Sequence, residues 1–170
     1  MFFELAGRLN PKRVCEIGVR AGYSAFTVLS ANPDAHVLGI EANLDHEKED
    51  AHGGQKGFYR HALQILEPFD FELLLVNSHD IKLLPRFDLF YVDGDHSFNG
   101  CLSDLELVEK STDQILVDDY ESIAPVREAC HEFLKTRPEF VAERIENGLT
   151  GFLLLHRENQ VANEPTDHQQ

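Results

Sequence analysis

Two acids and a histidine end an apolar segment near the middle of the sequence, and these residue types could bind a metal ion and move a proton. Residues 89–92 are apolar, and Asp93, Asp95 and His96 follow within the next four positions. Burying an unpaired carboxylate costs several kcal/mol, so a strand formed by residues 89–92 must leave the core before these acids. We expect the acids at the carboxyl end of this strand, where open α/β sheets bind their ligands.

A second apolar segment, residues 115–117, ends in the same way at Asp118 and Asp119. Two such strand ends could bring several carboxylates and one imidazole into one pocket, which suits a divalent metal beside a proton acceptor. Carboxylates favour Mg²⁺ or Ca²⁺ over zinc, and the sequence has no Cys/His set typical of zinc sites. A second interpretation stays open, because Asp118 and Asp119 could be a helix N-cap and its solvated neighbour.

The elements that would position these residues alternate between strand and helix. Short apolar segments predict buried strands, and apolar residues three or four positions apart predict helices. The predicted strands are residues 13–18, 36–41, 71–76, 88–92 and 114–117, with a closing hairpin of residues 140–145 and 151–156 around Asn147 and Gly148. The predicted helices are residues 23–31, residues 58–66, a segment containing Leu102, Leu105 and Val108, and a segment that opens at Pro125 and ends before Pro138.

This alternation predicts an α/β fold with a Rossmann-like doubly wound sheet. The sheet should be mostly parallel, with an antiparallel hairpin strand at the C-terminus. By length the chain is one domain, which we place at residues 1–157, followed by a flexible polar tail at residues 158–170. Residues 43–57 are polar and contain two adjacent glycines, so we expect a mobile loop there.

Glycines flank the turn between the first predicted strand and its helix. Gly18 could allow a tight turn and Gly22 a close approach by a ligand, although glycines at such turns can be purely structural. Ser24 offers a hydroxyl near the helix start, where the dipole favours anions. Glu41 ends the second predicted strand, about 20 residues on, where nucleotide-binding sheets place the acid that binds the ribose. Together these residues predict a nucleoside site, without a GxGxxG fingerprint or a P-loop.

These motifs resemble the class I methyltransferases that use S-adenosylmethionine, specifically the metal-dependent O-methyltransferases of the catechol and caffeoyl-CoA type. Residues 16–24 are similar to the family's Glu-x-Gly-x-x-x-Gly-Tyr-Ser first motif. Residues 93–97 are similar to the Asp-Gly-Asp-His-Ser motif of short bacterial relatives that act on sugars or small hydroxylated molecules. The resemblance covers residues 13–156, which is essentially the whole predicted fold.

The resemblance implies S-adenosylmethionine as the methyl donor and Mg²⁺ or another divalent cation as a cofactor. It implies a metal site formed by Asp93, Asp118 and Asp119. It places His96 at the position of the catalytic lysine of catechol-type members, so the implied catalytic residues are His96 and Asp93. The implied cofactor-binding residues are Glu16, Gly18, Gly22, Ser24, Glu41 at the ribose, Ala42, Ser78 and His79 at the adenine, and Asp93.

Three departures from the family pattern matter. Only residues 1–12 precede the first predicted strand, whereas family members carry a longer helical segment that covers the acceptor. A cover borrowed from a second subunit would make the protein a homodimer. Residues 111–113, Ser-Thr-Asp, stand where many relatives have a Gly-Gly pair. His96 replaces the lysine base, which leaves the identity of the base open.

Simpler structural roles also stay open for the residues around His96. His96 itself could be the base, because a pKa near 6.5 leaves it largely neutral at pH 7, or it could be a positioning hydrogen-bond donor. Asp95 could orient His96 or cap the following helix. Ser97 and Asn99 are more simply helix-capping residues.

Composition narrows the class of protein. The net charge is −15, and an evenly acidic surface repels phosphate backbones, so we expect no nucleic-acid partner. Cys15, Cys101 and Cys130 lie in apolar patterns without CxxC spacing, which predicts buried reduced thiols and a reducing compartment. No basic leader is present and no apolar segment approaches the ~18 residues of a membrane span, so we expect a cytoplasmic protein that binds no membrane.

From the sequence we therefore expect an S-adenosylmethionine-dependent O-methyltransferase that uses a divalent metal. Its acceptor should be a small hydroxylated molecule, such as a sugar or a phenol. Two alternatives stay open. One is a metal-independent methyltransferase whose carboxylates bind an amine or an acceptor directly, and the other is a non-catalytic module that binds S-adenosylmethionine or another nucleoside.

Overall fold

The computed structural model describes residues 1–42, 57–146 and 151–158. Each predicted strand and helix is present, with ends shifted by at most one residue. The elements in chain order are α1 (Phe2–Leu9), β1 (Arg13–Ile17), α2 (Tyr23–Ala31), β2 (His36–Glu41), α3 (Tyr59–Ile65), β3 (Phe71–Leu75), the 3₁₀ turn η1 (Ser78–Asp80), β4 (Leu89–Val92), α4 (Phe98–Val108), β5 (Gln114–Val117), α5 (Ala124–Thr136), β6 (Phe140–Ile145) and β7 (Phe152–Arg157). The expected loop at residues 43–56, the hairpin turn at 147–150 and the tail from 159 lie outside the described residues.

One seven-stranded sheet has the order β3-β2-β1-β4-β5-β7-β6. The first five strands in this order are parallel, and β7 pairs antiparallel with both β5 and β6. The predicted doubly wound sheet with an antiparallel C-terminal hairpin is therefore confirmed. Strand β7 takes the inner position and four of its six residues are buried, whereas β6 forms the edge and has a single buried residue.

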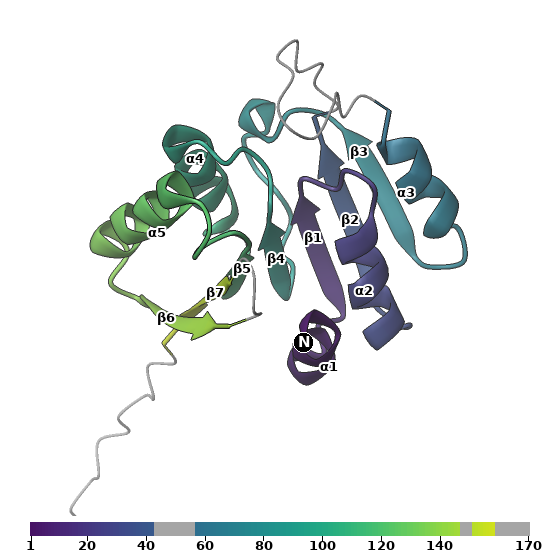
Figure 1. Cartoon of the computed structure of the whole chain (residues 1–170), viewed down its shortest axis with the longest axis horizontal. Coiled ribbons are helices and arrows are strands. Elements are labelled where there is room, and N and C mark those ends of the chain that lie inside the picture. Colours follow the sequence, from purple (N-terminus) through teal and green to yellow (C-terminus); the bar gives the residue numbers. More distant parts are fainter. Residues whose placement is uncertain (43–56, 147–150, 159–170) are drawn as a thin grey trace, which may run out of the picture.

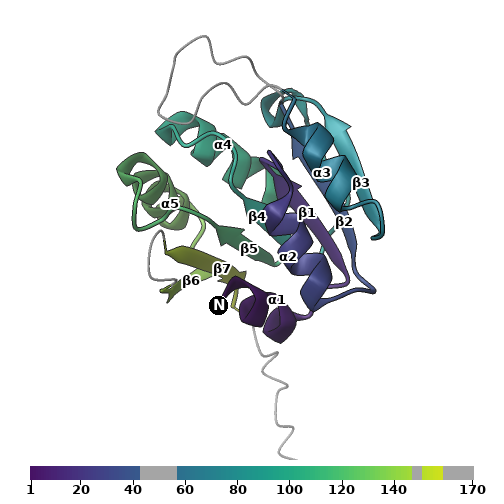
Figure 2. The ribbon, with the colours of Figure 1, turned by 45° about the vertical axis from the view of Figure 1, so that its right-hand side comes forward.

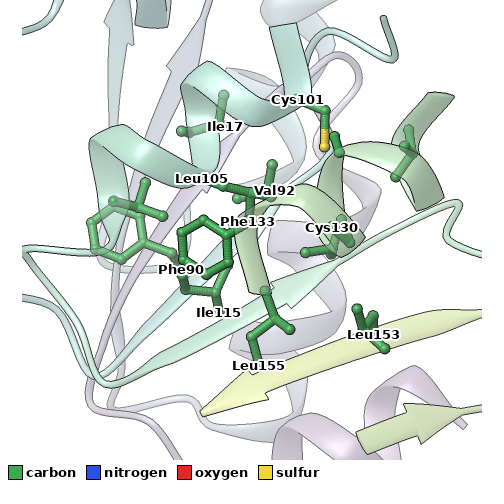
Figure 3. Packing of buried hydrophobic residues seen from close by; sticks show 14 of the residues in the cluster. Ile17, Phe90, Val92, Cys101, Leu105, Ile115, Cys130, Phe133, Leu153 and Leu155 are labelled. Atoms are coloured by element: carbon green, nitrogen blue, oxygen red, sulfur yellow. The ribbon is translucent and has the colours of Figure 1, made fainter. Parts of the chain in front are cut away.

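Helices cover both faces of the sheet, with α1, α2 and α3 on one face and α4 and α5 on the other (Figures 1 and 2). Strand β4 shows how the sequence serves both layers, because its side chains alternate between the faces. Phe90 and Val92 pack toward α4 and α5, together with Leu105 and Phe133 (Figure 3). The next residue along the strand from Phe90, Tyr91, packs in the second core beneath α1 and α2.

The cysteines are buried free thiols, as predicted. Cys101 of α4 and Cys130 of α5 lie in the same core cluster (Figure 3). Burial raises the pKa of the Cys15 thiol above its usual range, which keeps that thiol protonated. None of the described helices has the length and apolar composition needed to cross a bilayer.

Among the described residues, helix α1 and the short turn η1 are the elements that the sequence pattern did not predict. The apolar residues of α1 nevertheless follow helical spacing, and Leu5 and Ala6 are buried against the neighbouring helix and sheet. The helix ends at Asn10, which has the left-handed φ of 45° typical of a C-cap, and Pro11 follows. The buried Asn32 side chain at the end of α2 donates a hydrogen bond to the Ala6 carbonyl at 3.0 Å. Helix α1 is thus anchored by both packing and a hydrogen bond.

Opposite faces of α1 predict different costs of truncation. Leu5 is 4% exposed, so Leu5→Ala should lower the free energy of unfolding by about 2–5 kcal/mol through lost burial and a residual cavity. Phe3 is 53% exposed, so Phe3→Ala should change it by only about 0.5 kcal/mol. Denaturant unfolding of both variants measures the difference. Equally small losses would show that α1 does not pack on the sheet in solution.

Candidate functional site

The carboxyl ends of β1, β2, β3 and β4 border a cavity of about 410 Å³, a volume typical of small-molecule sites. The structure brings most of the predicted cofactor-binding residues to this one place. The predicted residues on the cavity wall are Gly18, Glu41, Ala42, Ser78, His79, Asp93 and His96. These positions come from four different strand ends, so the parallel order of the strands creates the site.

Gly18 allows two turns of the site to touch. Its φ is 93°, and a Cβ at this position would lie 2.0 Å from the Asp93 carbonyl oxygen. Only glycine fits this close approach of the β1–α2 turn to the end of β4. Gly22 has a different role, because its missing Cβ leaves room for Ala62 of α3, and it lines neither of the two cavities described here.

Glu41 joins the end of β2 to the glycine turn. Its Oε2 accepts a hydrogen bond from the backbone N–H of Arg20 at 2.7 Å. Arg20 has a left-handed φ of 49°, which orients its N–H toward this carboxylate. This hydrogen bond restricts the orientation of the carboxylate at the cavity wall.

Glu16 is 1% exposed and lies behind the cavity rather than on its wall. The Ser24 hydroxyl donates a short hydrogen bond to Oε1, and Oε2 has no partner among the described residues. Burial raises the pKa of Glu16 to about 8, and the Asp93, Glu41 and Asp118 carboxylates add to this shift, while the Ser24 hydrogen bond opposes it. Glu16 is therefore mostly protonated at pH 7, and it can affect a ligand through Ser24.

Ser78 and His79 start the 3₁₀ turn after β3. Both contact Asp104, an acid that was not among the predicted site residues. The Ser78 hydroxyl donates to Oδ1 of Asp104 at 2.6 Å, and the His79 Nε2 lies 3.7 Å from the same oxygen. Asp104 is 0% exposed, and burial raises its pKa. The sequence does contain a signal for this role, because Asp104 is an acid on the otherwise apolar face of α4 that includes Cys101 and Leu105.

An acidic centre forms where β4 and β5 end. The His96 Nε2 lies 3.0 Å from Asp93 Oδ1 and 3.7 Å from Asp119 Oδ2. One potential metal-ligand atom from each of these three residues lies within 4.8 Å of those of the other two. Burial is the main reason that the pKa of Asp93 rises to about 6, while the bond to Asp93 raises the pKa of His96. Two carboxylates and an imidazole are a donor set that a divalent cation can use.

Asp118 lies beside this group but makes its own contacts. Its Oδ2 accepts a hydrogen bond from the Tyr91 hydroxyl at 2.5 Å, and its Oδ1 accepts one from the Asp119 N–H at 2.7 Å. The N-cap of α5 is Ile123, so the structure gives neither acid the capping role that had been left open. The predicted ligands therefore lie together at one strand edge, with His96 inside the closest group and Asp118 at its border.

The remaining polar residues that the sequence singled out, Asp95, Ser97 and Asn99, lie in the turn before α4 or in its first residues. Ser97 caps this helix, because its hydroxyl accepts from the Gly100 N–H at 3.1 Å. Asp95 accepts from the Ser97 N–H at 2.8 Å, and its carboxyl packs against Gly100. Of the two roles left open for Asp95, these contacts support the turn and the helix start. Asn99 is exposed.

A second cavity, of about 570 Å³, adjoins the first. The two share Gly18, Arg20 and Asp93 on their walls. The second wall also contains Ser24, Asp118 and five aromatic residues that come from far apart in the sequence, which are Phe2 of α1, Tyr23 of α2, Phe58 before α3, Tyr91 of β4 and Phe152 of β7. Sequence periodicity alone explains Phe2, Tyr91 and Phe152 as core, so their place at the site depends on the fold.

Comparison with known proteins agrees with this geometry. Residues 15–120 match the family described as methyltransferase domain. The O-methyltransferase TomG from Streptomyces achromogenes, solved in complex with S-adenosylmethionine, has a TM-score of 0.64 at 22% identity, covering 92% of this chain and 77% of its own. An O-methyltransferase from Bacillus cereus in complex with SAH has a TM-score of 0.67 at 18% identity, with 92% and 79% covered. A methyltransferase from Geobacter sulfurreducens has a TM-score of 0.68 at 22% identity, with 92% and 76% covered.

A comparison with curated protein sequences gave no match. The family match nevertheless spans more than half of the 170 residues and includes the glycine turn, Glu41 and both acidic strand ends. The chain therefore belongs to the methyltransferase domain family, and its fold is that of the class I S-adenosylmethionine-dependent methyltransferases.

Proposed function

We propose that this protein is an S-adenosylmethionine-dependent O-methyltransferase that uses a divalent metal and a small hydroxylated acceptor. The observation that carries the proposal is the meeting of the two cavities at Asp93. A donor in the first cavity and an acceptor in the second would face each other there. Methyl transfer needs such an arrangement, because holding the reactants aligned can supply roughly 7–11 kcal/mol of the barrier.

The first cavity suits the nucleoside of the methyl donor. Glu41 would bind the ribose, and Ser78 and His79 would contact the adenine at the far end. The donor carries a positive sulfonium, and the Asp93 carboxylate at the junction of the cavities is a favourable neighbour for that charge. The neutral Glu16 behind the glycine turn would hold Ser24 in place without adding a further negative charge.

The acidic centre suits a divalent cation, which when bound would lower the pKa of an acceptor hydroxyl and orient its oxygen. We propose Asp93, Asp118 and Asp119 as its ligands and His96 as the group that accepts the acceptor's proton. Support comes from the short distances among Asp93, His96 and Asp119. The same distances would also suit His96 as a ligand, and the effect of replacing His96 separates the two roles.

The second cavity suits a ring-shaped acceptor, either a phenol or a sugar. Its wall combines five aromatic side chains, among them Phe2, Tyr91 and Phe152, with the hydroxyls of Ser24 and Thr27. Aromatic faces bury the flat or apolar side of a ring, and the hydroxyls can bond its polar groups.

A second candidate function is a metal-independent methyltransferase. The observation that favours it is the direct 3.0 Å contact between His96 and Asp93. A carboxylate that pairs with an imidazole can support proton removal without a cation. The two candidates differ in whether transfer needs a metal.

Asp119→Asn tests the metal. The wild-type protein should bind S-adenosylmethionine in calorimetry with or without EDTA and transfer methyl groups only with a divalent cation. The variant should keep its Kd for S-adenosylmethionine. Its metal-dependent activity should fall by about 10–100-fold or more, because mutating a group that only supports a metal ligand already has this cost. Glu128→Gln removes an exposed carboxylate from α5 and serves as the control. Transfer that ignores EDTA would favour the metal-independent candidate, and failure to bind S-adenosylmethionine would refute both.

His96→Gln tests the base. If His96 accepts the proton, kcat should fall about 10²–10⁴-fold, because that is the usual contribution of a positioned acid or base. The Kd values for the metal and for S-adenosylmethionine should stay at the wild-type level, since neither depends on the imidazole in this role. A weaker metal Kd with no further loss of kcat at saturating metal would instead make His96 a ligand.

Glu16→Gln tests the buried neutral acid. The pKa of Glu16 is about 8 in the folded protein and near 4.5 in an unfolded chain, so the folded state binds more protons between these values. The free energy of unfolding should therefore fall as pH rises from about 5 to 8, by about 1.4 kcal/mol for each unit of pKa difference. The amide cannot titrate, so the variant should lose less stability over this range in urea unfolding. Parallel curves for the two proteins would show that Glu16 is ionised at pH 7.

A further inference from the structure

We propose that the Tyr91 hydroxyl is a positioning group that holds the Asp118 carboxylate in place for the divalent metal. The inference rests on the proposed function in one respect, which is that Asp118 is a metal ligand. It adds a residue that neither the motif nor the strand-end pattern indicates, and it links the metal site to helix α1.

The strand register brings the two groups together. Tyr91 of β4 lies opposite Leu116 of β5, so Asp118 is two residues farther along the neighbouring strand and its side chain is within reach of a long tyrosine. The hydroxyl oxygen of Tyr91 lies 2.5 Å from Asp118 Oδ2, which is the short distance of an O–H donor bonded to a charged acceptor.

Both oxygens of Asp118 are held by a donor. Oδ2 accepts from Tyr91, and Oδ1 accepts from the backbone N–H of Asp119. Hydrogen bonds at both oxygens restrict the rotation of the Asp118 carboxylate. A carboxylate oriented in this way would lose less conformational entropy when it binds a cation.

The Tyr91 ring is held separately from its hydroxyl. Tyr91 is 3% exposed, and the Phe2 ring stacks on it at 5.2 Å with an angle of 27° between the ring planes. The Phe152 ring lies 6.4 Å away in an edge arrangement, and Phe2 contacts Phe152 as well. The first residue of α1 thus fixes the tyrosine that fixes the carboxylate. Because the ring contacts do not involve the oxygen, phenylalanine should preserve the packing.

The Tyr91 hydroxyl donates its hydrogen bond to Asp118 at the end of β5. The same two residues, Tyr91 and Asp118, lie on the wall of the second cavity next to Asp93. The hydrogen bond is therefore at the place where an ion and an acceptor would meet. A hydrogen bond with a purely structural role in the core would not line a cavity that a ligand can enter.

Tyr91→Phe isolates the hydroxyl. Titration with Mn²⁺ by calorimetry, repeated with Mg²⁺, should show about 10–100-fold weaker metal binding, because loss of a group that orients a ligand has this typical cost. The Kd for S-adenosylmethionine should remain at the wild-type value, since Tyr91 is not on the wall of the first cavity. Tyr120→Phe is the matched control, because Tyr120 is also buried and its hydroxyl lies 3.0 Å from His131 of α5. The control should bind both metals as the wild type does.

A double-mutant cycle with Asp118→Asn shows whether Tyr91 acts through Asp118. If it does, Tyr91→Phe should weaken metal binding in the wild-type background and have no further effect in the Asp118→Asn background. Unchanged metal binding by Tyr91→Phe would overturn the inference, as would additive losses. Parallel losses of metal binding, cofactor binding and melting temperature would reassign Tyr91 to the fold alone. If the wild-type protein binds neither metal, the metal assignment of the proposed function is refuted. If the wild type and Tyr91→Phe bind metal equally well, only the inference about Tyr91 is refuted.

Discussion

Repulsion among carboxylates at one edge of the sheet is the constraint on which this site depends. Three of these acids meet this constraint in different ways. Glu16 is buried and carries a proton, with a pKa near 8. Asp93 lies against the imidazole of His96, and Asp118 accepts hydrogen bonds from Tyr91 and from a backbone N–H. The negative potential that remains favours a cation, and both a divalent metal and a sulfonium are cations.

The fold supports the two halves of the site with separate buried contacts. Beside the first cavity, the buried Asp104 accepts a hydrogen bond from the Ser78 hydroxyl, and this bond joins the end of β3 to α4. On the other side, Phe2 and Phe152 hold Tyr91. Between them, Gly18 lets the first turn touch Asp93. Each contact joins segments distant in sequence, so the precision of the site comes from packing of the whole domain.

The N-terminal helix changes how the acceptor side is understood. The short segment before β1 raised the expectation that a cover would come from a second subunit. In the structure this segment is itself a helix, packed on α2, and its first residue lines the second cavity. Part of the wall of the second cavity, where we propose that the acceptor binds, therefore comes from this chain. Residues 2, 5, 6 and 9 carry the helical apolar spacing that predicts this packing, but an eight-residue helix is marginal without tertiary contacts.

The sequence by itself determined where the apolar segments end, where the glycine turn lies and which acids follow each segment. Those features depend on local burial and backbone freedom, so the doubly wound sheet and the gathering of Glu41, Asp93 and Asp119 at one edge could be predicted. Only the tertiary structure decided that His96 stands within the closest group, that Asp118 bonds Tyr91, and that Asp104 supports Ser78. Contacts of this kind depend on strand register and side-chain rotamers across non-local pairs, which a linear pattern does not encode.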